Sequence, residues 1–97
     1  MTLSEFKKSV QQSAPPSDLN ILLQALWYDA KGQWDTAHQL AQEVETSHGS
    51  WIHAYLHRKE GDTANADYWY AHCGEERPRG ALEKEWESLV QSLLAGQ

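Results

Sequence analysis

Two segments of this chain follow one pattern at a fixed offset. Residues 25–37 begin and end with alanine and carry Gly32 between, and residues 54–66, 29 positions later, repeat this with Gly61. Self-similarity with a period of a few tens of residues is typical of stacked supersecondary units. Such proteins generally act by binding a partner on the surface that the stacked units form. The repeat therefore predicts a binding protein rather than an enzyme.

Hydrophobic spacing predicts helices throughout the chain. Apolar residues recur at three- and four-residue intervals, and no segment sustains the period-two alternation of a strand. The expected helices cover residues 2–12, 18–31, 34–45, 51–59, 62–72 and 81–94. We therefore expect an all-α protein with five to six helices.

Polar residues with the spacing of helix caps mark where these helices begin. Thr2 and Glu5 have the spacing of a capping box. Ser17, Ser50 and Asp62 each precede a helical segment and are candidate N-caps, because their side-chain oxygens can accept hydrogen bonds from free amides of the first turn.

The two copies resemble a tetratricopeptide repeat. The matching residues are Ala25, Tyr28, Gly32 and Ala37 in the first copy and Ala54, His57, Gly61 and Ala66 in the second, with Tyr70 and Pro78 at the places of a large ring and a closing proline. The period is about five residues shorter than the family's usual 34. Sel-like repeats, with a similar architecture, are resembled almost as closely.

The resemblance implies stacked antiparallel hairpins in a single domain over residues 1–97. Its parts would be an N-terminal helix and linker (1–16), a first hairpin (17–47), a second hairpin (50–73) and a helix capping the last hairpin (79–95). It also implies binding of a protein or peptide on a concave surface lined by the first helix of each hairpin.

The second copy carries the candidate partner-binding residues. Trp51, Tyr55 and Arg58 form an i, i+4, i+7 row on one helix face, and Lys59 follows directly. Aromatic residues and arginine often anchor interfaces, because they combine a large contact area with a polar end. Trp51 and Tyr55 could equally fill the core, so both locations remain open for them.

A pair of histidines gives an alternative site. His53 and His57 stand at i, i+4, which places both imidazoles on one helix face, as in metal sites. Spacing marks no third ligand, and the resembling repeat buries both positions. A hydrogen-bonded interior pair is therefore the favoured interpretation, a metal site is the alternative, and no cofactor is expected.

Charge and motifs narrow the classes of function. Eight basic against fourteen acidic residues give a net charge of −6, which opposes binding to nucleic acid. The chain contains no run of apolar residues long enough for a membrane span and no secretory signal, so a cytoplasmic location is expected. Phosphate-loop and nucleophile motifs are absent, and Glu83, Glu85 and Glu87 are expected to solvate a helix face.

These observations together favour a non-catalytic module that binds a protein or peptide. Self-association is a second possibility, since the amphipathic helix over residues 81–94 could pair with its copy in a homodimer. The third is the metal or small-ligand site at the paired histidines.

Overall fold

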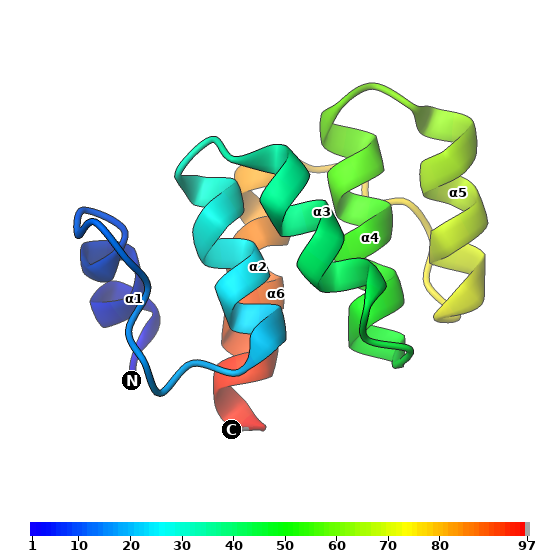
Figure 1. Cartoon of the computed structure of the whole chain (residues 1–97). Coiled ribbons are helices and arrows are strands. Elements are labelled where there is room, and N and C mark those ends of the chain that lie inside the picture. The colour runs from blue at the N-terminus through cyan, green and yellow to red at the C-terminus, as the bar shows by residue number, and fades with distance from the viewer. Residues whose placement is uncertain (97) are drawn as a thin grey trace.

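The computed structural model describes residues 1–96 and contains six α-helices, with no strand among these residues (Figure 1). The helices are α1 (Leu3–Ser9), α2 (Ile21–Ala30), α3 (Trp34–Gln42), α4 (Ser47–Lys59), α5 (Thr63–His72) and α6 (Leu82–Ala95). The all-α prediction is confirmed. In the described part of the chain, no helix has both the length and the apolar content needed to cross a bilayer.

Helices α2 to α5 form two antiparallel hairpins, α2–α3 and α4–α5, which are joined by packing of α3 on α4 (Figure 1). Gly32 and Gly61 make the tight reversals within the hairpins. Their φ angles are +82° and +89°, in the left-handed region that glycine adopts without steric cost. The turns predicted at these two residues are confirmed.

Small residues let the two helices of each hairpin approach closely. Ala25 and Ala37 in the first hairpin and Ala54 and Ala66 in the second are all fully buried. A larger side chain at any of these positions would push the helix axes apart. The repeated alanines are therefore explained by helix packing.

Helix α6 does not stack on the outer side of the last hairpin, as the resemblance implied. It packs on α1, α2 and α4, and Figure 1 shows it behind α2, far from the outer face of α5. The reason is hydrophobic, since Leu89, Val90 and Leu93 are buried in the same cluster as Leu22 and Leu26. The chain thus covers the face formed by the first helices of its two hairpins.

Helix α2 begins three residues later than predicted. The N-cap is Asn20 rather than Ser17, because the Asn20 side chain accepts a hydrogen bond from the Leu23 amide at 2.9 Å. Both residue types are good N-caps, so the residue type alone does not show which of the two caps the helix.

Helix α4 begins earlier than predicted. Thr46 caps it by accepting a hydrogen bond from the Gly49 amide at 3.1 Å, so the expected cap Ser50 lies inside the helix. Residues 47–50, which lie between two of the predicted helices, therefore form the first turn of α4. By contrast, the capping box at Thr2 and the N-cap at Asp62 are confirmed.

The first turn of α4 makes a close backbone contact that requires glycine. A Cβ atom on Gly49 would lie 2.0 Å from the carbonyl oxygen of Val44. We expect Gly49→Ala to lower the free energy of unfolding by about 2 kcal/mol, because the loop before α4 must move. Gly80→Ala is the control, since its Cβ would meet open space. Urea denaturation measures both, and equal stabilities would contradict the contact.

Candidate functional site

The residues predicted to bind a partner lie on α4 and turn toward α2 and α6. Tyr55 is 2 % exposed, and its hydroxyl donates a hydrogen bond to Asp29 Oδ2 at 2.9 Å. The Lys59 ammonium pairs with Oδ1 of the same carboxylate at 2.8 Å. Burial and the Asp29 charge raise the pKa of Tyr55 above its usual range, so the hydroxyl keeps its proton. Of the two locations left open for Tyr55, the structure shows the core.

Glu85 of α6 is the second carboxylate that this row contacts. Trp51 Nε1 and the Tyr70 hydroxyl donate to its Oε2 at 3.0 and 2.7 Å, and Arg58 pairs with its Oε1 at 2.8 Å. Arg58 also donates to the Gly80 carbonyl. Glu85 is only 4 % exposed, so the prediction of a solvated face is wrong at this position. Three donors compensate for removing its charge from water.

Two buried carboxylates thus tie α4 to its neighbours. Asp29 lies on α2 and Glu85 on α6, and donors from α4 reach both of them. A buried charge is tolerated only when it is paired and hydrogen-bonded, and both conditions hold here. The predicted row consequently serves the packing of α4 between α2 and α6.

A cleft of about 470 Å³ opens beside another face of α4. It lies between the end of α3, the loop after α3, the first turns of α4 and the end of α5. Its lining residues are Ala41, Gln42, Val44, Glu45, Thr46, Ser47, Gly49, Ser50, His53, Trp69 and His72. The cleft combines apolar groups, hydroxyls and one carboxylate.

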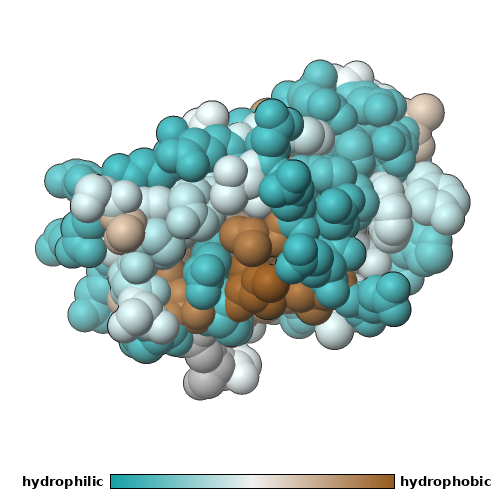
Figure 2. All heavy atoms as spheres, viewed as in Figure 1, coloured by the Kyte–Doolittle hydropathy of each residue, from teal (hydrophilic) through white to brown (hydrophobic). Residues whose placement is uncertain are grey.

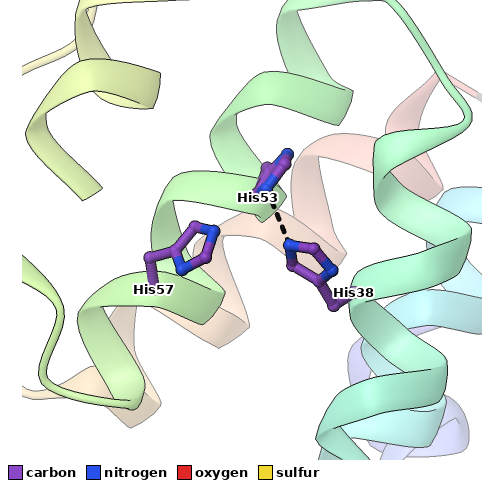
Figure 3. A group of neighbouring side chains, drawn as sticks. All are labelled: His38, His53 and His57. Carbon is purple, nitrogen blue, oxygen red and sulfur yellow. Dashed lines mark hydrogen bonds between the residues drawn. The ribbon is translucent and has the colours of Figure 1, made fainter. Parts of the chain in front are cut away.

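Three histidines meet beside this cleft (Figure 3). His38 comes from α3, whereas His53 and His57 lie one turn apart on α4. The Nε2 atoms of His38 and His53 are 2.8 Å apart and share a hydrogen bond. One ring nitrogen from each histidine lies within 4.8 Å of those of the other two. Because His53 also lines the cleft, the cluster and the cleft adjoin.

Two tryptophans hold the imidazole rings in place. Trp34 stacks on His38 with ring centroids 4.8 Å apart, and Trp69 stacks on His53 at 4.1 Å. Trp34 is itself fixed, because its Nε1 donates to the carbonyl oxygen of Leu56 at 2.8 Å. The orientations of these two histidines are therefore set by the surrounding structure.

The environment of His38 and His53 favours neutral imidazoles. Burial, reinforced by the neighbouring His38 and His57, lowers the pKa of His53 to about 4. Burial likewise lowers the pKa of His38. His57 has a carboxylate partner, since its Nδ1 lies 2.6 Å from Glu60 Oε1. The cluster thus combines two neutral imidazoles that share a hydrogen bond with a third imidazole held by a carboxylate.

Sequence reasoning found two of these three histidines. His53 and His57 are buried, as predicted, and each is hydrogen-bonded, although to His38 and Glu60 rather than to the other. His38 was missed because it lies 15 residues before His53, on another helix. The only available signal was its i, i+4 spacing from Trp34, which carries no information about α4.

Removing the Glu85 carboxylate tests the buried network. We expect Glu85→Ala to lower the free energy of unfolding by about 3–5 kcal/mol, because it leaves two neutral donors without their acceptor and the Arg58 charge without its counter-ion, with only the Gly80 carbonyl remaining. Glu83→Ala is the matched control on an exposed position of the same helix. Urea denaturation followed by circular dichroism compares the two variants, and similar midpoints would overturn this assignment.

Comparison with known proteins gives no relative for this chain. No family model matches it, and neither a curated protein nor a solved structure matches it significantly.

Proposed function

We propose that this protein is a non-catalytic module that binds a peptide segment of another protein in the cleft between α3, α4 and α5. The observation that carries the proposal is the cleft itself, a concavity of about 470 Å³ whose lining combines apolar side chains with hydroxyls and one carboxylate. The face that the tetratricopeptide resemblance assigns to a peptide is already occupied by α6.

The lining of the cleft fits an apolar side chain next to a basic one. Val44 and Trp69 provide apolar contact area, and Glu45 is the one carboxylate among the described lining residues. A lysine or arginine of the bound segment would pair with Glu45, and the net charge of −6 would attract it from a distance. Hydroxyls from Thr46, Ser47 and Ser50 could bond the peptide backbone.

Apolar surface adjacent to the cleft supports the same proposal. Figure 2 shows apolar side chains at the surface over α2 and α3. Ile21, Leu40 and Val44, on these helices and the loop after α3, are only partly buried. Since Val44 also lines the cleft, a bound segment could continue from the cleft onto this surface.

Self-association through α6 finds less support. Trp86, Leu89, Val90 and Leu93 are all buried within the molecule. A dimer through the same side chains would require α6 to leave the core. The peptide proposal needs no such rearrangement.

Selection of peptides from a random displayed library tests the proposal. We expect the enriched peptides to pair an aliphatic or aromatic residue with lysine or arginine. We expect Glu45→Lys to weaken their binding by about tenfold or more, since charge repulsion replaces an ion pair. Isothermal titration calorimetry gives the affinities.

Glu43→Lys is the matched control. This residue is exposed, lies two positions away and does not line the cleft, but its substitution changes the net charge equally. Equal losses of peptide affinity in the two variants would show that the effect comes from the overall charge and not from an ion pair with Glu45. Failure to enrich any peptide would contradict the proposal.

A further inference from the structure

The nitrogens of the histidine cluster lie close to the separations that a metal ion imposes. Metal–nitrogen bonds of about 2.0–2.1 Å in tetrahedral geometry place ligand nitrogens about 3.4 Å apart. The Nε2 atoms of His38 and His53 are 2.8 Å apart, and the three-nitrogen set has no separation above 4.8 Å. Side-chain shifts of about 1 Å would therefore bring three nitrogens onto one ion.

His57 has the partner that metal-bound histidines commonly have. Metal-ligating imidazoles usually engage a carboxylate or carbonyl through the second ring nitrogen, which fixes the ring and raises the basicity of the ligating nitrogen. Nδ1 of His57 lies 2.6 Å from Glu60 Oε1, which leaves Nε2 for an ion. Asp62 lies next to this pair, because His57, Glu60 and Asp62 also place ligand atoms within 4.8 Å of one another.

The surroundings limit the movement of the rings. Trp34 and Trp69 stack on His38 and His53 with interplanar angles of 13° and 16°. Stacking of this kind holds the ligands before an ion arrives, so binding costs little ordering entropy. In Figure 3 the ring of His38 reaches from α3 toward the histidines of α4.

The hydrogen bonds of this cluster do not join all three imidazoles to one another. One N–H···N bond accounts for His38 and His53. His57 bonds Glu60 instead, while its ring stacks on His53 with centroids 4.8 Å apart and meets His38 edge-on at 5.1 Å. A cation coordinated by all three rings would join them at one point.

We propose that His38, His53 and His57 bind one divalent transition-metal ion, with Glu60 as the carboxylate that positions His57. Three imidazoles select Zn²⁺, Co²⁺, Ni²⁺ or Cu²⁺ over Mg²⁺ and Ca²⁺, which prefer oxygen ligands. Within residues 1–96 the cluster provides three nitrogens, so water or an external ligand completes a four-coordinate shell. The ion would join α3 to α4 and thereby link the two hairpins.

Metal titration of the full-length chain tests this site. After treatment with a chelator and its removal, the protein is titrated with zinc chloride by isothermal titration calorimetry. We expect one ion per chain at micromolar or tighter affinity. At a hundredfold excess of zinc over Kd, the Tm should rise by about 10 °C or more, because the ion binds the folded state alone. Magnesium chloride should change neither quantity.

Conservative variants locate the ion. His38→Gln should weaken zinc binding by more than about 100-fold, and Glu60→Gln, which removes only the positioning carboxylate, by about 10-fold. His48→Gln is the control, because His48 bonds Ser92 outside the cluster and should leave the affinity unchanged. Zinc binding that survives in His38→Gln, or that is lost equally in His48→Gln, would overturn the proposal.

A measurement on the unmodified protein keeps the proposal testable if His38→Gln does not fold. Long-range ¹H–¹⁵N spectra of histidine-labelled protein report each imidazole nitrogen separately. Zinc should shift one nitrogen each of His38, His53 and His57 and leave the signals of His48 unchanged. Unchanged signals from the cluster would rule out the site. The cleft residue Glu45 takes no part, so failure of the peptide proposal leaves this result intact.

Discussion

The arrangement of this protein depends on two buried carboxylates that α4 satisfies from one of its faces. Asp29 and Glu85 are 2 % and 4 % exposed, and each would be costly to bury alone. Side chains of α4 provide donors to both, and Tyr70 of α5 adds another to Glu85. Because these partners lie on α2 and α6, the network fixes the rotation of α4 about its axis and holds α6 against the first helices of the hairpins.

This rotation also creates the candidate site. Side chains two positions apart on a helix point about 200° apart, so when Trp51 and Tyr55 face α6 and α2, His53 and His57 face the other side. There α3 supplies His38 and α5 supplies Trp69, which stacks on His53. The cleft and the histidine cluster thus depend on the rotation of α4 about its axis. The proposed peptide and metal sites both include residues of α4.

Much of the local structure followed from the sequence, and the reasons are local. Gly32 and Gly61 adopt positive φ because the chain reverses within a few residues, and the capping box at Thr2 needs only neighbouring groups. Less was predictable where two caps of similar quality competed. The caps of α2 and α4 are Asn20 and Thr46 rather than Ser17 and Ser50, and cap propensity does not distinguish such residue types.

The all-α class, the reversals at Gly32 and Gly61 and the helical face shared by His53 and His57 could be predicted from the sequence, since these depend on periodicity and on contacts within a few residues. Long-range packing sets three features that the sequence did not predict: α6 covers the first helices of the hairpins, Glu85 is buried, and His38 joins His53 and His57. Helical spacing fixes which residues of one helix share a face. It does not fix which other helix that face meets, because that depends on how the side chains of all six helices pack together.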